Sequence, residues 1–286
     1  MQNVRIQAVR YLNTVPLIAG LDKVAGLSLS TTVPSRIAEA VSDGEADIGL
    51  VSAVDLVRAP VPLAALPVGM IGCEGPTLTV RVFSAVPMEQ VRTIHADTDS
   101  RTSVALARML ITRRAGRIPD IAPFDAREWM SLEPADRAEW PDTVLLIGDK
   151  VVTDAPSPIR YPHQLDLGEA WHAWTGLPFV YALWACRADR TNDPKMSTAI
   201  ELLDRQRRRN RMRLDHIVSR EAARLGWPDD LARDYVGRLL RYEVTEPARR
   251  GLERFMSEAF EAGLVQDRSI SWASAAPARL GASIAS

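Results

Sequence analysis

The stretch "LSLSTTVPSRIAEAVSDGEADIGLVSA" (residues 27–53) decides the fold class of this chain. Its first residues alternate between apolar and polar side chains, which predicts a strand. Pro34 and Gly44 enclose the helical pattern that follows, because proline fits the first turn of a helix and glycine the position just after its end. The apolar run of residues 46–53 then predicts a buried strand. Strand, helix and strand in this order indicate parallel strands joined by a crossover helix.

Two long apolar segments interrupt this pattern and carry the chain between two lobes. The first lies within residues 63–87, and the second, residues 176–187, leads back. A length of 286 residues also favours two lobes over a single core. We therefore predict an α/β fold with a double crossover and a ligand cleft between the lobes. Residues 1–86 and 187–286 are expected to form one discontinuous lobe, and residues 87–186 the other.

The composition argues against several classes of protein. Lys and Arg number 35 against 36 Asp and Glu, so the net charge of −1 gives no general attraction to nucleic acid or to an anionic membrane. The basic run "RQRRRNRMR" (residues 205–213) lies in a C-terminal segment with a helical pattern, and we interpret it as a solvated helix face. There is no secretory signal pattern and no apolar run of about 18–20 residues, so we expect a cytoplasmic protein that does not enter a membrane.

Familiar catalytic motifs are missing from the sequence. The four histidines show no zinc-binding spacing, and G-x-G-x-x-G, P-loop and G-x-S-x-G patterns do not occur. Cys73 and Cys186 stand far apart in apolar runs, where each is expected to be a small buried side chain. We therefore predict that the protein uses neither a metal nor an organic cofactor.

Small polar residues follow the ends of three predicted strands. They are Asn13 and Thr14, Ser52 and Ala53, and Ser100, Arg101, Thr102 and Ser103. In open parallel sheets ligands bind outside the carboxyl ends of the strands, and helix N-termini there attract anions. The same residue types also cap helices, so simple capping is the alternative at each position. Together the three junctions favour a small carboxylate ligand held between the lobes, for binding or for chemistry that needs few charged groups.

Five segments in order resemble the chorismate dehydratase family. They are "RYLNTVPL", "VPSRIAEAVSDGEADIGLVSAVDL", "DTDSRTSVALARMLI", "LLIGDKVV" and "LDLGEAWHAWTGLPFVYALWA". The match runs from residue 4 to about residue 187 and continues more loosely in the helical tail. The resemblance implies a type II periplasmic-binding-protein-like fold. It also implies loss of water from the dicarboxylate chorismate, giving 3-(1-carboxyvinyloxy)benzoate in the futalosine route to menaquinone, without a cofactor.

The resemblance also implies roles for individual residues. Asn13 and Ser52 are expected to be catalytic, with Asn13 at the reacting centre. Eight further residues are expected to bind the substrate: Thr14, Ala53, Thr79, Ser100, Arg101, Thr102, Ser103 and Asp149. Thr79 stands where many relatives carry serine, and Asp149 either orients a hydroxyl or holds the hinge. One hypothesis is that a carboxylate of the substrate itself acts as the base.

Two other functions stay open. The sister enzyme of the same pathway, a dihydroxynaphthoate synthase, shares the fold but uses a histidine where this chain has Gly148 and Asp149, and it lacks the "YLN" opening. A non-catalytic protein that binds small carboxylates is the second alternative, since many proteins of this fold are receptors. The expected state of the protein is a monomer or a homodimer.

Overall fold

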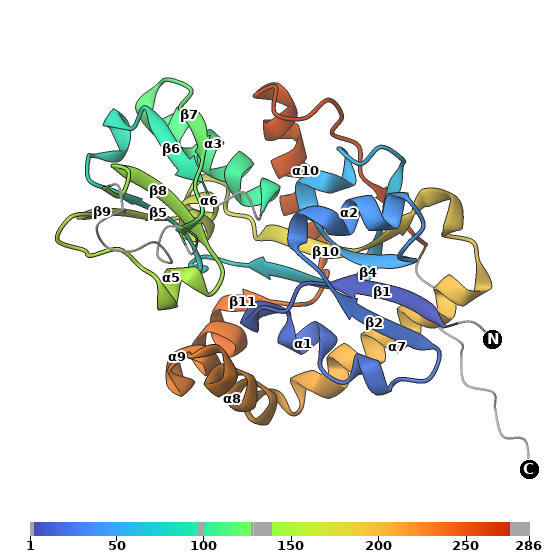
Figure 1. Cartoon of the computed structure of the whole chain (residues 1–286). Coiled ribbons are helices and arrows are strands. Elements are labelled where there is room, and N and C mark those ends of the chain that lie inside the picture. The colour runs from blue at the N-terminus through green and yellow to red at the C-terminus, as the bar shows by residue number, and fades with distance from the viewer. Residues whose placement is uncertain (1–2, 97–99, 127, 129–138, 275–286) are drawn as a thin grey trace, which may run out of the picture.

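The structure is a computed structural model of the chain and describes residues 3–96, 100–126, 128 and 139–274. The described strands form two separate sheets, one of seven strands and one of five. Figure 1 shows the smaller sheet, mostly green, beside the larger one. One cluster of buried apolar side chains takes residues from both sheets, so the two lobes pack against each other.

The larger sheet has the strand order β11-β4-β10-β3-β1-β2, with β12 beside β4. Its strands are β1 (Val4–Ala8), β2 (Leu27–Thr31), β3 (Ile48–Ser52), β4 (Leu63–Cys73), β10 (Phe179–Arg187), β11 (Leu240–Arg241) and β12 (Ser271–Trp272). Strand β1 pairs in parallel with both β2 and β3, which confirms the predicted parallel unit. Strand β10 runs antiparallel to β3 and β4 and carries the chain back into this sheet.

The smaller sheet has the strand order β7-β6-β8-β5-β9. Its strands are β5 (Val80–Ser84), β6 (Thr93–Ala96), β7 (Asp120–Pro123), β8 (Thr143–Ile147) and β9 (His163–Asp166). Strands β6, β7 and β8 are parallel, and β5 runs antiparallel to β8 and β9. The predicted strand at residues 91–97 corresponds to β6, and residue 97 lies outside the described residues.

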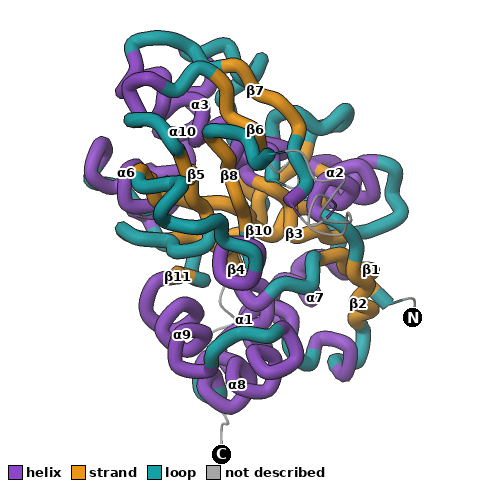
Figure 2. Tube along the Cα trace, turned by 60° about the vertical axis from the view of Figure 1, so that its left-hand side comes forward, coloured by secondary structure: helices purple, strands orange, loops and turns teal. Residues whose placement is uncertain are grey.

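Helices cover both sheets, and the C-terminal segment is helical as predicted. The described α-helices are α1 (Val15–Ile18), α2 (Pro34–Ser42), α3 (Arg101–Ala115), α5 (Lys150–Thr153), α6 (Leu167–Thr175), α7 (Pro194–Arg211), α8 (Leu214–Leu225), α9 (Asp229–Asp234) and α10 (Glu246–Glu261). Helix α1 packs against α7 and α8, so the C-terminal segment returns to the N-terminal lobe. Figure 2 shows α8 and α9 gathered beneath α1, away from the smaller sheet.

The approach of α2 to the larger sheet depends on a glycine. A Cβ atom added at Gly49 of β3 would lie 2.6 Å from Ile37 Cγ2 and 2.8 Å from Val41 Cγ2, both on α2. Real Cβ atoms do not come so close, so only glycine lets the helix lie this near the strand. This packing fixes where β3 ends, and with it the position of Ser52.

The two crossovers differ from the prediction in where they lie. Strand β5 belongs to the smaller sheet and β10 to the larger one, so the chain changes sheets between Cys73 and Val80 and again between Asp166 and Phe179. The predicted lobe limits of 1–86, 187–286 and 87–186 place both strands on the wrong side. The residues between β4 and β5, "EGPTLT" (residues 74–79), mark a break, but the strands on both sides are apolar, so the sequence does not tell which sheet each strand joins. Lobes divided at these two crossovers stay a proposal.

A single carboxylate joins the two crossovers. Asp166, at the end of β9, accepts hydrogen bonds from the backbone N–H of Thr77 at 3.0 Å and of Leu78 at 2.7 Å. It also caps α6 by accepting from Gly168 N at 3.0 Å and Glu169 N at 3.1 Å. Leu78 has a φ of +66°, a conformation that is costly for a leucine and is kept here because both neighbouring segments are tied down.

The remaining expectations about the chain concern cysteines and membranes. Cys73 and Cys186 are buried and free, as predicted, and burial raises the pKa of the thiols to about 12 and about 11. Both are therefore protonated and unreactive near neutral pH. Among the described helices, none is long and apolar enough to cross a membrane.

Candidate active site

A cavity lies where the ends of strands from both sheets meet. Its lining residues are Val9, Tyr11, Asn13, Pro34, Leu50, Ser52, Ile71, Thr77, Thr79, Val80, Ser100, Ser103, Ile147, Tyr181, Ala182, Tyr235 and Leu240. Its volume is about 80 Å³. Pockets for small ligands usually measure about 300–1,000 Å³. A ligand of ordinary size therefore enters only when the two lobes move apart.

Ten residues were predicted to form the site, and the structure describes all of them. Five line the cavity: Asn13, Ser52, Thr79, Ser100 and Ser103. The other five do not: Thr14, Ala53, Arg101, Thr102 and Asp149. Polar residues after the strand ends therefore indicate where the cavity lies, but they do not indicate which side chain at each junction faces into it.

Asn13 faces the cavity from a 3₁₀ turn, η1 (Leu12–Thr14), which leads directly into α1. Its Oδ1 atom is buried and has no hydrogen-bond partner among the described residues. A buried oxygen without a partner is costly, and such atoms call for an explanation. A ligand in the cavity would supply the missing donor, so Asn13 is a strong candidate for direct contact.

The position of α1, and so of Asn13, is secured from the C-terminal segment. On α7, Gln206 Nε2 donates to the carbonyl of Ala19 at 2.8 Å, and Asn210 Nδ2 donates to those of Pro16 at 3.1 Å and Ala19 at 2.9 Å. These bonds satisfy carbonyls at the end of α1. The basic run thus contains two buried amides that hold the N-terminal segment in place, while its arginines other than Arg207 are exposed.

Thr79 meets a tyrosine that the sequence did not suggest. Its Oγ1 lies 2.5 Å from the hydroxyl of Tyr235, and both side chains are buried. Burial raises the pKa of Tyr235 above its ordinary value, with Thr79 and Asn13 acting in the opposite direction and Asp149 adding to the rise. The phenol is therefore protonated at any pH at which the protein works.

Ser52 lies at the end of β3 and joins the two lobes. Its Oγ lies 2.7 Å from Thr102 Oγ1, and Thr102 Oγ1 also accepts a hydrogen bond from Val54 N at 2.9 Å. Thr102 is fully buried in this contact and does not reach the cavity. In this structure Thr102 forms a bond between the lobes, and its role as a ligand contact stays a prediction.

Arg101 has a different partner from the predicted substrate carboxylate. Its guanidinium lies 3.2 Å from Asp55 and 3.9 Å from Glu39, both of the other lobe. Burial raises the pKa of the Asp55 carboxyl, and the Arg101 charge opposes that rise only in part. Two carboxylates of the chain thus pair with Arg101, which does not line the cavity, and no local pattern indicates that Asp55 lies beside it.

Three further predicted residues have structural surroundings. The hydroxyl of Thr14 donates to the carbonyls of Val9 at 3.0 Å and Tyr11 at 2.8 Å, which fixes the turn before α1. Ala53 is fully buried at the start of a short turn after β3. Asp149 is buried before α5 and acts on Tyr235 as a nearby negative charge. None of the three lines the cavity.

The N-terminus of α3 gives the cavity its site for a negative charge. Ser100 caps the helix by accepting hydrogen bonds from the N–H of Ser103 at 3.3 Å and from its hydroxyl at 3.1 Å. The capping interpretation is thus correct for Ser100, yet both serines also line the cavity. The positive end of the helix dipole therefore faces the cavity, where a carboxylate would be stabilised.

Three hydroxyl-bearing residues of the cavity, Thr77, Tyr181 and Tyr235, were missed by the sequence reasoning. The Tyr181 hydroxyl and Thr77 Oγ1 are buried without a hydrogen-bond partner among the described residues, and both residues line the cavity. Tyr181 lies within the apolar run of β10, and Tyr235 lies in the helical segment far along the chain. Neither position carries a local pattern that separates a cavity residue from a core residue.

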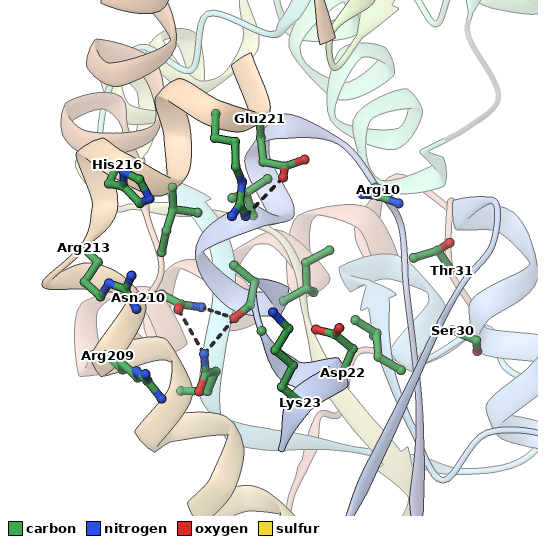
Figure 3. A pocket seen from close by; sticks show the side chains of 18 residues that line it. Arg10, Asp22, Lys23, Ser30, Thr31, Arg209, Asn210, Arg213, His216 and Glu221 are labelled. Atoms are coloured by element: carbon green, nitrogen blue, oxygen red, sulfur yellow. Dashed lines mark hydrogen bonds and ion pairs between the residues drawn. The ribbon is translucent and has the colours of Figure 1, made fainter. Parts of the chain in front are cut away.

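A metal-binding cluster and a second cavity are the other possible ligand sites. The described residues contain no group of three or more His, Cys, Asp or Glu side chains placed to hold a metal ion. A larger cavity of about 720 Å³ lies between α1 and helices α7 and α8. Figure 3 shows its wall, with the bonds of Asn210 to α1 as dashed lines and with Arg10, Arg209 and Arg213 around it. None of the ten predicted residues lines this larger cavity.

Comparison with known proteins places the chain in a family. A family model described as menaquinone biosynthesis matches residues 4–261. The chain belongs to this family. It is 30% identical over 260 residues to the chorismate dehydratase of Thermus thermophilus, an alignment that covers 86% of this chain and 91% of that protein. The predicted family is thereby confirmed.

Solved structures confirm the fold. A protein of Archaeoglobus fulgidus superposes with a TM-score of 0.66 at 16% identity, covering 92% of this chain and 98% of its own. The periplasmic aliphatic sulphonate binding protein of Escherichia coli superposes with a TM-score of 0.61 at 13% identity, covering 94% and 95%. Members of this menaquinone-biosynthesis family and periplasmic binding proteins thus share one two-lobed α/β architecture.

Proposed function

We propose that this protein is a chorismate dehydratase, a carbon–oxygen lyase that converts chorismate to 3-(1-carboxyvinyloxy)benzoate and water in menaquinone biosynthesis. The Thermus thermophilus relative of that name supports the assignment. The cavity between the lobes also supports it. There the buried Asn13 Oδ1 has no hydrogen-bond partner among the described residues, and Ser52, Thr79 and Ser103 supply hydroxyls. The unpartnered Asn13 oxygen is the single observation that carries the proposal furthest, because a hydroxyl of the substrate would satisfy it.

The reaction suits a site built from neutral groups. Removal of a ring proton and of the neighbouring hydroxyl makes the ring aromatic, so much of the driving force lies in the substrate. The protein then needs to orient the substrate and stabilise charge rather than supply a strong base. Ser100 and Ser103 at the start of α3 would hold one carboxylate, and Asn13 would contact the ring hydroxyl or the ether oxygen. A second carboxylate of the substrate remains our candidate for the base.

Two alternatives make different demands on the cavity. The sister dihydroxynaphthoate synthase is expected to use a histidine, and no histidine is among the residues that line the described cavity. A receptor that only binds a small carboxylate fits the same geometry, and structural relatives include a sulphonate binding protein. The observation that separates a receptor from a dehydratase is turnover.

The test uses the purified protein without additions. Chorismate is incubated with it in the presence of EDTA, and the products are followed by mass spectrometry. The proposal expects a product lighter by one water and no inhibition by EDTA. Tight binding of unchanged chorismate would favour the receptor, and conversion that stops on chelation would contradict a metal-independent site. A cytoplasmic location and a monomeric or dimeric state stay predictions.

A further inference from the structure

Tyr235 and Thr79 form a buried pair of hydroxyls at the wall of the cavity. Their oxygens lie 2.5 Å apart, and the exposed fractions of the two residues are 1% and 2%. They come from distant parts of the chain, since Thr79 lies in the first crossover and Tyr235 in the C-terminal helical segment. Hydrogen bonds in such water-free surroundings are strengthened by the low local dielectric, so this contact is a stable part of the site.

The local backbone aims Tyr235 at this position. A π-helical turn, η7 (Tyr235–Leu239), directly follows α9, and such turns occur frequently at functional sites. The ring of Tyr235 stacks on Trp227 with centroids 5.1 Å apart and planes at 13°. The stacking fixes the ring, so the hydroxyl has little freedom to turn away from Thr79.

The other groups around the cavity leave few sources for a proton. Among the described residues, its lining contains no Asp, Glu, His, Lys or Arg. The described lining residues that could donate a proton are therefore hydroxyls, among which phenols are by far the more acidic. Three tyrosines line the cavity: Tyr11, Tyr181 and Tyr235. Tyr235 is bonded to a second hydroxyl of the same cavity, whereas the Tyr181 hydroxyl has no partner among the described residues.

We propose that Tyr235 and Thr79 form a proton relay to the hydroxyl group that leaves the substrate, an inference that rests on the proposed dehydratase function. The Tyr235 proton moves to Thr79 Oγ1 while the Thr79 proton moves to the departing oxygen. The carbon–oxygen bond breaks with both electrons going to that oxygen, which leaves as water. The substrate carboxylate that takes the proton from the ring carbon passes it on to the Tyr235 phenolate, which becomes the neutral phenol again, so the protein is unchanged and one water is lost. Thr79 contacts the substrate, and Tyr235 acts through Thr79.

This relay answers a chemical need of the reaction. Hydroxide is a poor leaving group, and a proton delivered as the bond breaks removes that difficulty. Burial raises the pKa of Tyr235 and so disfavours a free phenolate, which means that the transfer from Tyr235 has to be concerted with the departure of the hydroxyl. Threonine is a competent intermediate carrier, because its hydroxyl accepts one hydrogen bond and donates another at the same time.

The experiment compares five variants of the full chain. Tyr235→Phe and Thr79→Val each remove one hydroxyl, and the double variant removes both. Thr79→Ser keeps the relay, and Tyr242→Phe is the matched control, since the buried Tyr242 hydroxyl has no hydrogen-bond partner among the described residues and does not line the cavity. For each variant, kcat and KM for chorismate and the melting temperature are measured.

The relay predicts a characteristic set of results. Tyr235→Phe and Thr79→Val should each lower kcat about 100-fold, a usual share for acid–base groups, with KM changed by less than about twofold. The double variant should lower kcat by no more than about 100-fold, because either single substitution already interrupts the same relay. Thr79→Ser and Tyr242→Phe should keep kcat within about threefold of the wild type.

Other outcomes overturn either the relay or the function beneath it. If the wild type is active and Tyr235→Phe keeps its kcat, the relay alone is overturned. The same holds if the double variant lowers kcat by about 10⁴-fold, the product of the two single losses. If Tyr235→Phe does not fold, equal rates for Thr79→Val and Thr79→Ser overturn it. A folded wild type that does not convert chorismate overturns the dehydratase function and the relay together.

Discussion

The Ser52 hydroxyl lies 2.7 Å from the Thr102 hydroxyl, which joins the end of β3 in the larger sheet to the first turn of α3, beside the smaller sheet. Val54 N adds a second bond to the same oxygen of Thr102. Because the cavity is small, about 80 Å³, we expect these bonds to open when substrate enters and to form again on closure. On this account the binding of substrate and the contact between the lobes are coupled.

Thr102→Val tests this coupling. The substitution keeps the shape but leaves Val54 N without its acceptor, so we expect a loss of about 1–2 kcal/mol in the free energy of unfolding. We also expect a rise of about tenfold in KM for chorismate, because the closed arrangement is weakened. Thr112→Val is the control, since its hydroxyl on the same helix bonds only to the Arg108 carbonyl. Equal effects of the two variants on KM would contradict the coupling.

Asp55 gives the contact between the lobes a dependence on pH. Burial raises the pKa of its carboxyl in the folded protein above the ordinary value of 3.8. Between that value and the raised one, the folded state binds more protons than the unfolded state, so the free energy of unfolding falls as pH rises. Asp55→Asn removes this titration. We therefore expect the free energy of unfolding of the variant, relative to that of the wild type, to increase as pH rises from about 3.5 through the raised pKa of Asp55. Urea unfolding at a series of pH values measures this difference. A relative stability that is flat or falls would contradict the assignment.

Asp166 is predicted to be the main polar support of both crossovers. Asp166→Ala leaves four backbone N–H groups without their acceptor, so we expect a loss of about 3 kcal/mol or more in the free energy of unfolding. Asp193→Ala serves as the control, because this half-buried carboxylate caps α7 through one backbone bond to Lys195 N and pairs with Arg190, and its loss should cost about 1 kcal/mol. Urea unfolding of both variants decides the point, and similar losses would argue against a special role for Asp166.

Much of the architecture could be predicted from local patterns, and the limits of prediction have physical causes. The parallel unit around residues 27–53 follows from alternation, Pro34 and Gly44, since these features act within a few residues. The crossover limits could not be placed because the strands on both sides of each crossover are apolar, and no pattern within a strand tells which sheet it joins. The surroundings of Arg101 could not be predicted because its partner Asp55 comes close only in the folded chain.

The candidate site shows the same division. Asn13 and Ser52 could be found because polar residues at strand ends are visible in the sequence, and both line the cavity. Tyr235 could not be found, since its place depends on a π-helical turn and on the return of the C-terminal segment to the first lobe. The orientation of a side chain at a junction, as for Thr14 against Asn13, is decided by packing and not by residue type.

Asn13 carries the sharpest prediction about chemistry. Asn13→Asp and Asn13→Ser should fold and melt close to the wild type, because both residues suit the turn before α1. Their turnover of chorismate should fall about 100-fold or more, since a lost polar contact to the transition state costs that much. Melting curves and initial rates measured side by side separate the two effects. Retained turnover in either variant would make Asn13 a structural residue.

The proton NMR spectrum of chorismate mixed with the purified protein tests the central claim most directly. A dehydratase predicts that the signals of the cyclohexadiene ring disappear and four aromatic proton signals replace them, while the two protons of the enolpyruvyl group persist. Chorismate signals that only broaden through binding, with no aromatic product after prolonged incubation, would contradict the account.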